Sequence, residues 1–398
     1  MKRKILMENT GEQIRTFFLE DDDIVEIHCA AAEEEVGKNR HALGDIYVGR
    51  VKNIVQNIGA AFIEIAPGIN CYYDMKEADH ALFTKKTGRK PICIGDELVV
   101  QISKEAVKTK APTVTGNFSF SGRFAVLTHG NTRIGVSSKI PKKMRDEYKE
   151  KLKDWQNDNF GIIVRTNARD VPFEAVLEEL SALRREYERI LHSAPTRVCF
   201  SCLRAAPPSY ISDLKNVYMD GMEEIVIEGE ELYTRIHNYF ETELPDKKGL
   251  LRLYDDTSFS LCKLYSTDTA LQKALNEKVW LRHGGYLVIQ PTEALTVIDV
   301  NSGKNISKGR NEEGIMKINL EAAREAARQI RLRNLSGIII IDFINMESDE
   351  NINLLIREFR GFLAADPIQT TLVDITPLNL VEVTRKKVHR PLYEQVSL

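Results

Sequence analysis

Apolar and polar positions change their spacing along this chain, and each spacing predicts a different kind of element. From residue 1 to about 39, apolar and polar residues alternate, for example over residues 16–20 and 24–28, which predicts antiparallel strands. From Gly44 to about residue 102, the chain shows short strand-like runs separated by glycines and a basic loop. Short strands at near-even spacing, with glycine where the chain must bend, are typical of a small barrel such as the OB fold.

Two later segments show helical periodicity instead. In the first, Asp170 is placed to cap a helix and Pro172 suits its first turn. The apolar face of this helix is formed by Phe173, Leu177, Leu180, Leu183, Tyr187 and Ile190. In the second, the apolar positions are Met316, Leu320, Ala323, Ala327 and Ile330, while Lys317, Arg324, Arg328 and Arg331 share a different face.

Two short apolar runs, residues 295–298 and 338–341, each end in an aspartate, Asp299 and Asp342. Runs this short and this rich in isoleucine and valine predict central strands that are covered on both faces. The second helical segment lies between them, and a strand, helix and strand in this order predict a crossover that places the two aspartates side by side.

Carboxylates at the ends of buried strands need a cation, a hydrogen-bond network or a cleft, because removing a charge from water is costly. Two carboxylates together suggest a shared Mg²⁺, whose usual setting is one or two carboxylates with phosphate oxygens, and this indicates phosphate-ester chemistry. The alternative is that Asp299 and Asp342 only cap the loops or helices that follow. Asn301 favours the metal, because it lies two residues beyond Asp299 on an extended segment and points to the same side.

Composition is that of an ordinary globular protein, with 43% hydrophobic and 28% charged residues, and 398 residues predict about two to four domains. No apolar run reaches the length of about 18 residues that a membrane-spanning helix needs, and no signal peptide is recognisable, so we expect a cytoplasmic protein. The six cysteines are scattered, which favours reduced thiols. Cys199 and Cys202 form the only close pair, and since zinc would need further ligands, an incidental pair is favoured.

Charge alone does not identify a partner, because the net charge is −3. Basic residues nevertheless cluster at 85–90, 104–110, 139–143 and 385–390, and local positive stripes can bind phosphate on an acidic protein. Solvated surface is the alternative for each cluster. The eight histidines form no close pair in the sequence, which gives no support for histidine acid–base catalysis, although folding could still bring two together.

Longer motifs resemble a known family. Residues 44–51 and 59–63 and the tyrosines after Gly68 resemble the OB-fold RNA-binding domain of the ribosomal S-one type. The two aspartate runs, together with residues 280–286, 292–295, 319–323 and 330–333, are similar to the catalytic core of the ribonuclease E/G family. The resemblance covers nearly the whole chain, in order.

The resemblance implies a role for each matching residue. Asp299 and Asp342 match the family's magnesium ligands, and Asn301 matches the asparagine that supports them. The RNA-binding positions of the OB fold are matched by Phe62, Tyr72 and Lys110, and the pocket that senses a 5′-monophosphate by Gly122, Val126, Arg165 and Thr166. A guanidinium and a hydroxyl at the end of a strand also suit a terminal phosphate on physical grounds, with a surface pair between Arg165 and Asp170 as the alternative.

The resemblance also implies an α/β chain of several subdomains. Residues 1–39 and 210–275 are expected to form a split RNase H-like subdomain, interrupted by an OB-fold RNA-binding domain at 40–112 and a 5′-sensor region at 113–209. Residues 276–398 are expected to form a DNase I-like catalytic subdomain. Larger family members continue into a Cys-Pro-x-Cys zinc link and a small dimerising domain, which the sequence does not show, so no zinc link is expected and homo-oligomerisation stays open.

The implied activity is endonucleolytic hydrolysis of single-stranded RNA with Mg²⁺, or Mn²⁺ as an alternative, leaving 5′-phosphate and 3′-hydroxyl ends. Stimulation by a 5′-monophosphate and a role in rRNA and tRNA processing and mRNA decay are implied as well, with rRNA precursors and mRNA as substrates. Two alternatives stay open. The chain could be a non-catalytic RNA-binding or ribosome-assembly factor of the same fold, or a scaffold for other enzymes, although no long disordered tail supports a scaffold.

Overall fold

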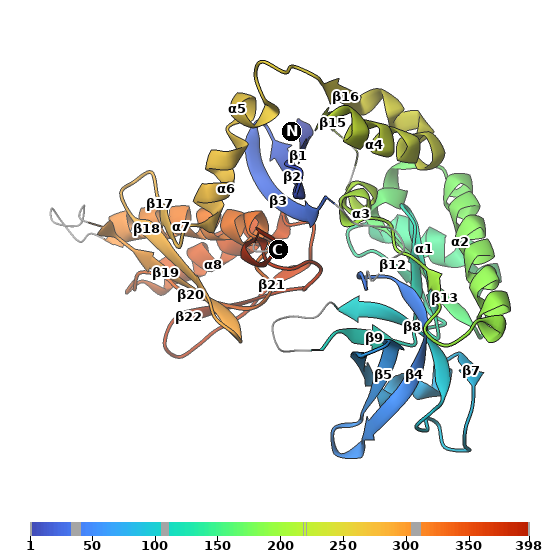
Figure 1. Cartoon of the computed structure of the whole chain (residues 1–398). Helices are drawn as coiled ribbons and strands as arrows, with labels where there is room; N and C mark the ends of the chain where they lie inside the picture. The colour runs from blue at the N-terminus through green and yellow to red at the C-terminus, as the bar shows by residue number, and fades with distance from the viewer. Residues whose placement is uncertain are drawn as a thin grey trace. The chain divides into compact units, whose positions relative to one another are not determined.

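The computed structural model describes residues 2–32, 41–104, 111–217, 219, 221–303 and 312–396 (Figure 1). These residues form two units, of which the first combines Met1–Glu33 with Asp220–Leu398 and the second is Glu34–Met219. The chain therefore leaves the first unit, builds the second and returns to complete the first. No helix in the described parts of the chain has both the length and the apolar character needed to cross a membrane.

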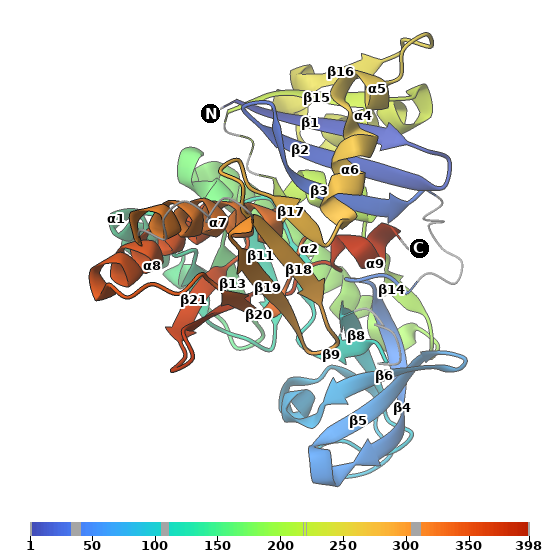
Figure 2. The ribbon, with the colours of Figure 1, turned by 90° about the vertical axis from the view of Figure 1, so that its left-hand side faces the viewer.

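The first unit contains a five-stranded sheet in the order β16-β15-β1-β2-β3. The predicted antiparallel strands at the start of the chain are confirmed as β1 (Arg3–Asn9), β2 (Gln13–Glu20) and β3 (Asp23–Ala31). β1 also pairs in parallel with β15 (Met222–Glu228), which in turn pairs with β16 (Leu251–Tyr254). Residues on both sides of the inserted unit thus share one sheet (Figure 2).

Helices surround this sheet. They are α4 (Glu230–Glu243), α5 (Leu261–Tyr265), α6 (Thr267–Leu275) and, near the C-terminus, α9 (Leu392–Val396). Leu271 and Ala274 of α6 and Leu392 of α9 share a buried cluster with Phe17 and Ile27 of the sheet. This cluster holds the short α6 and α9 against the sheet, because their apolar side chains and those of the strands cover one another and are removed from water together.

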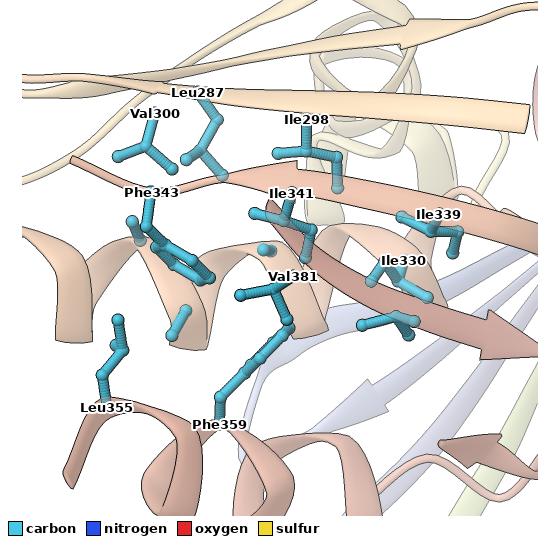
Figure 3. Close-up of a cluster of buried hydrophobic side chains, with 14 of the residues drawn as sticks. Leu287, Ile298, Val300, Ile330, Ile339, Ile341, Phe343, Leu355, Phe359 and Val381 are labelled. Atoms are coloured by element: carbon cyan, nitrogen blue, oxygen red, sulfur yellow. The ribbon is translucent and has the colours of Figure 1, made fainter. Parts of the chain in front are cut away.

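A six-stranded sheet forms the rest of the first unit. Its order is β17-β18-β19-β20-β22-β21, with bounds Lys278–Trp280, Tyr286–Pro291, Leu295–Asn301, Gly337–Asp342, Leu380–Arg385 and Thr370–Ile375 in that order. The helices α7 (Glu312–Leu332) and α8 (Asp349–Ala364) pack against one face (Figure 1). Figure 3 shows the core between them, where Ile298, Ile341 and Phe343 meet Leu355 and Phe359. The predicted helix between the aspartate runs is confirmed as α7.

The prediction that both aspartate strands are covered on two faces is wrong. In β19, Thr296, Ile298 and Val300 are buried, whereas the alternate residues are only half-buried. In β20, Ile339 and Ile341 are fully buried, but Ile338 on the other face is 53% exposed. The physical reason is that α7 and α8 pack only on the side of Ile298 and Ile341. We call the other side, which carries Asp299 and Asp342, the open face of this sheet.

Buried ion pairs join distant parts of the first unit. Arg385, predicted to belong to a phosphate-binding cluster or a solvated surface, is instead 1% exposed, and its Nε lies 2.7 Å from Asp366 Oδ2. Its Nη1 donates to Asn334 Oδ1 at 2.6 Å. Arg331 of α7 pairs with Glu20 and Glu26 of the other sheet at 3.1 and 3.3 Å. These guanidinium groups are engaged in ion pairs that stabilise the unit and are not available to bind a phosphate.

The second unit begins with a closed five-stranded barrel, which confirms the predicted OB-like fold. Around the barrel the strands are β4 (Ile46–Val55), β5 (Ala60–Ala66), β6 (Ile69–Asp74), β9 (Thr113–Thr115) and β8 (Glu97–Lys104), and β8 pairs back with β4. β7 (Phe83–Lys85) and β14 (Cys202–Arg204) extend the sheet. A Cβ at Gly49 would lie 2.5 Å from Ile63 Cγ2, so glycine is required where β4 crosses the interior.

The rest of the second unit is a four-stranded sheet covered by a long helix. The sheet order is β10 (Ser119–Ser121), β11 (Ala125–His129), β13 (Phe160–Val164) and β12 (Ile134–Val136), and α1 (Lys142–Lys151) contacts β12. A further helix, α3 (Ser209–Asn216), lies near the end of the unit in the sequence. The predicted helix is confirmed as α2 (Phe173–Ser193), with Leu180, Leu183, Tyr187 and Ile190 buried. The predicted cap is wrong. The N-cap is Pro172 without a side-chain bond, and Asp170 accepts from Arg169 Nε at 3.0 Å in the preceding turn.

Candidate functional site

The two aspartates lie side by side because of the strand register. β19 and β20 pair in parallel, with Ile298 opposite Ile341 and Asp299 opposite Asp342. Since successive side chains point to opposite faces, the burial of Ile298 and Ile341 places both carboxylates on the open face. Neighbouring strands are about 4.8 Å apart, so one small cation can contact an oxygen of each. The predicted juxtaposition is confirmed.

Asn301 supports this pair directly. Its Nδ2 donates to Asp299 Oδ2 at 2.6 Å, and it lies on the same face because it is two residues further along β19. This bond holds one carboxylate oxygen and leaves the other available. Asp299 is half-buried and Asp342 is exposed. Both carboxylates are therefore in contact with solvent in this unit.

The chemistry of the donor set fits a hydrated magnesium ion. Within the described parts of the chain, no lysine, arginine or histidine forms an ion pair with Asp299 or Asp342, so these residues provide no counter-ion for the two negative charges. No three histidine, cysteine, aspartate or glutamate side chains among the described residues form a metal cluster. Two carboxylates without nitrogen or sulfur ligands suit Mg²⁺, which keeps several waters and takes further oxygens from phosphate, and do not suit structural zinc.

A tight turn flanks the site where β17 joins β18. Glu321 of α7 accepts from the backbone N–H of Arg282 at 2.6 Å and from His283 Nδ1 at 2.6 Å. Burial alone raises the pKa of Glu321, but the bonds from His283 and from the two backbone groups outweigh it and lower the pKa. A Cβ at Gly285 would lie 2.8 Å from the carbonyl oxygen of Asn301. Glycine there lets the turn approach the backbone that carries the site.

Two aromatic residues lie on the outer surface of the barrel, where the resemblance expects RNA. Phe62 of β5 pairs with Tyr72 of β6, and their ring centroids are 6.4 Å apart at 87°. Both are half-buried, whereas their neighbours Ile63 and Tyr73 are fully buried inside the barrel. The two rings therefore lie on the outside of the barrel and are not part of its core. Lys110, the third predicted RNA-binding residue, lies outside the described residues.

The predicted 5′-sensor residues come together at one end of the four-stranded sheet. Arg165 follows β13, and its Nη1 donates to the carbonyl oxygen of Gly122 at 2.7 Å. Val126 of β11 is opposite Ile163 of β13, which brings it to the same end. The hydroxyl groups of Thr166 and Ser137 lie 2.8 Å apart. The Arg165 guanidinium and the pair of hydroxyls thus lie at the same end of the sheet, and each kind of group can donate a hydrogen bond to a phosphate.

Glu179 of α2 fixes the shape of this region. Its carboxylate accepts from the backbone N–H groups of Arg123, Phe124 and Ala125 at 2.5, 2.7 and 2.9 Å. A Cβ at Gly122 would collide with the same carboxylate, which explains the glycine. Burial lowers the pKa of Arg165, and the charge of Glu179 opposes this shift. The sequence did not single out Glu179, because a glutamate in a helix gives no sign of a distant loop partner.

Folding brings together one pair of histidines that the sequence keeps apart. The rings of His28 and His389 lie 5.0 Å apart, but His28 is buried and its Nε2 lies 2.8 Å from Glu26 Oε1. Burial raises the pKa of Glu26, but His28 and the charges of Arg331 and Arg385 outweigh it and lower the pKa to about 2. His28 therefore belongs to an interior ion-pair network with Glu26 and Arg331.

Comparison with known proteins agrees with this geometry. A family model described as the ribonuclease E/G family matches residues 119–388. The chain belongs to the ribonuclease E/G family. It is 32% identical over 384 residues to ribonuclease E of Synechocystis sp., an alignment that covers 94% of this chain and 55% of that protein. It is 28% identical over 400 residues to ribonuclease G of Haemophilus influenzae and 27% identical over 404 residues to ribonuclease G of Escherichia coli K12, each covering 80% of the relative and 98% and 97% of this chain.

This ribonuclease E/G chain thus spans about half the length of its ribonuclease E relatives. The matched span of the family model holds Asp299, Asp342 and Arg165, whereas Phe62 and Tyr72 precede it. The sequence analysis missed another part of the open face, formed by Lys278, Trp280 and Tyr286. Alternation along β17 and β18 is the pattern that could have placed them on one side of a strand pair.

Proposed function

We propose that this chain is a magnesium-dependent endoribonuclease that hydrolyses single-stranded RNA. The observation that carries the proposal is the pairing of Asp299 with Asp342 on the open face, with Asn301 bonded to Asp299 and no basic partner among the described residues. The relatives named ribonuclease E and ribonuclease G support RNA as the substrate.

Each group near the carboxylates has a task in this proposal. Asp299 and Asp342 would hold the ion, and a bound ion would polarise the scissile phosphate and lower the pKa of a nearby water. Asn301 fixes the orientation of Asp299 through its amide, and the other oxygen of Asp299 would be available to the ion. Attack by water and departure of the ribose 3′-oxygen leave a 5′-phosphate and a 3′-hydroxyl. A cyclic phosphate would instead indicate histidine acid–base catalysis.

Asp299→Asn and Asp342→Asn test the proposal. Each removes one carboxylate ligand and keeps the size of the side chain, so cleavage of a short RNA in Mg²⁺ should be abolished. RNA affinity in EDTA should stay within a few-fold of wild type. Glu243→Gln, which removes one exposed carboxylate at the end of α4, is the matched control and should cleave normally. Near-normal turnover by either asparagine variant, or products with cyclic phosphate ends, would refute the proposal.

Stimulation by a 5′-monophosphate is the second part of the proposal, with Gly122, Val126, Arg165 and Thr166 around the phosphate. Because Arg165 also holds the carbonyl of Gly122, Arg165→Ala would disturb the loop as well as the pocket. Thr166→Val is sharper, since it removes only a hydroxyl. Its cleavage of 5′-monophosphorylated RNA should fall towards the rate for 5′-hydroxyl RNA, mainly through KM. An equal fractional loss on both substrates would assign Thr166 to the fold.

Selectivity for single strands follows from the barrel. Bases in a duplex are already stacked and cannot reach Phe62 and Tyr72, whereas unpaired bases can. We further propose that the physiological substrates are rRNA and tRNA precursors and mRNA, processed or degraded in the cytoplasm. Sequencing of 5′-monophosphate ends in cells that carry Asp342→Asn would test this, because the proposed cleavage products should disappear.

A further inference from the structure

A cluster of one lysine and two aromatic rings lies on the open face beside the carboxylates. Trp280 of β17 is 67% exposed, although tryptophan is the largest apolar side chain. Its ring centroid lies 5.3 Å from that of Tyr286 on β18, at an angle of 61°. Lys278 Nζ lies 4.1 Å from the Trp280 centroid and 3.6 Å from the Tyr286 centroid. The three side chains form what we call the aromatic platform.

The strand register connects this platform to the carboxylates. Trp280 is opposite Tyr286, which is opposite Asn301, and these three form one row across the sheet. The next row runs from Lys278 through Val288 to Asp299 and Asp342. Alternation places every member of both rows on the open face. At about 4.8 Å per strand, Tyr286 is one strand away from Asn301 and Lys278 is about 10 Å from Asp299.

Packing does not account for the exposed ring. The core side of β17 and β18 is already filled by Val279 and Leu287, which join the cluster under α7 and α8. Trp280 points to the other side and leaves two thirds of its surface in water. An exposed aromatic ring next to a cation provides the two groups that bind a nucleotide: a flat surface for the base and a positive charge for the phosphate.

We propose that the aromatic platform is a nucleotide subsite, in which a base next to the scissile phosphate stacks on Trp280 and Tyr286 and Lys278 contacts the adjoining phosphate. This subsite rests on the proposed function, because it assumes RNA across Asp299 and Asp342. A protein partner fits the same face poorly. Covering it would bury two carboxylates that have no basic partner among the described residues, and such burial is costly.

Tryptophan fluorescence tests the subsite without cleavage. The chain has two tryptophans, so Trp155→Phe leaves Trp280 as the only one. In EDTA, binding of a short single-stranded RNA should quench this emission, and the same sequence as a duplex should not. Trp280→Ala should weaken binding about 5- to 150-fold, which corresponds to the range for one base stack, and Trp280→Phe should restore most of it. Phe259→Ala removes another exposed ring of the same unit, at 45% exposure, and is the matched control.

A scan with abasic nucleotides then locates the base. If Trp280 stacks on one base, removing that base should weaken binding to the Trp155→Phe protein but have little further effect on Trp280→Ala. The proposal is overturned if RNA binds without quenching, if Trp280→Ala and Phe259→Ala bind alike, or if abasic losses add to the mutation at every position. A change in emission that depends on protein concentration alone would assign the face to a second copy and also overturn it. Failure of the proposed function is a separate result, since it would appear as quenching without magnesium-dependent cleavage.

Discussion

The carboxylate pair on the open face should cost stability when no cation is bound. Asp299 and Asp342 are opposite each other on adjacent strands, and two like charges about 5 Å apart repel by about 1–3 kcal/mol between the limits of bulk water and a protein surface. Asp299→Asn or Asp342→Asn removes this repulsion. Asparagine at 299 also keeps an oxygen for the amide of Asn301. In EDTA, each variant should therefore be more stable than wild type, with an unfolding midpoint about 2–12 °C higher.

Magnesium should reverse this order. At a concentration 100 times its dissociation constant, a ligand that binds only the folded protein stabilises it by about 2.7 kcal/mol. Wild type should gain this stability, whereas the asparagine variants, each missing one ligand, should gain little. The assay is thermal unfolding of wild type, both variants and Glu243→Gln in EDTA and across a magnesium titration. The reasoning is refuted if the variants match Glu243→Gln in EDTA, or if magnesium raises all four midpoints equally.

Three further predictions follow from other groups. Burial raises the pKa of Glu8 to about 7, above the ordinary value of 4.5, so its neutral form contributes stability that is present below pH 4.5 and lost as pH rises through 7. Urea unfolding at pH values from 4.5 to 7 should show that the free energy of unfolding of Glu8→Gln rises by about 3 kcal/mol relative to that of wild type. A difference between the two proteins that does not change with pH would contradict the prediction. Asp366→Ala leaves Arg385 buried without its carboxylate and should lower the free energy of unfolding by about 3–5 kcal/mol, measured by denaturant titration; a loss below about 1 kcal/mol would show that water replaces the carboxylate. Phe62→Ala should weaken RNA binding by about 1–3 kcal/mol with little change in the unfolding midpoint, because the ring is outside the barrel; a lower midpoint with unchanged affinity would make Phe62 a core residue.

Local periodicity explains which parts of the fold the sequence could predict. The alternating strands of residues 13–31, the glycine-spaced strands of the barrel and the helices α2 and α7 all carry their own pattern. The pairing of Asp299 with Asp342 was also predictable, because a helix between two apolar strands favours a parallel pair. Asn379 is in the left-handed conformation, with φ of 62°, as its position in a turn suggests.

The remaining features depend on partners that the sequence does not place. Ile338 and Ile341 belong to one uniform run, yet one is exposed and the other buried, because α7 and α8 pack on the face of the sheet that carries Ile341. Arg385 resembles a surface cation until the fold brings Asp366 to it. The same applies to Glu179, whose three backbone partners lie more than fifty residues away.

The pairing of β1 with β15 has a consequence for synthesis on the ribosome. Ile5, Leu6 and Met7 are fully buried in a strand whose parallel neighbour begins at Met222. While the chain between them is being translated, β1 is paired with β2 along one edge, and its other edge lacks its partner β15. An unpaired apolar edge of this kind can pair with a strand of another nascent chain. The second unit, Glu34–Met219, is complete before Met222 emerges and can fold first. Slow translation of this insert therefore prolongs the exposure of the β1 edge, and nascent chains stalled within it should depend most on chaperones.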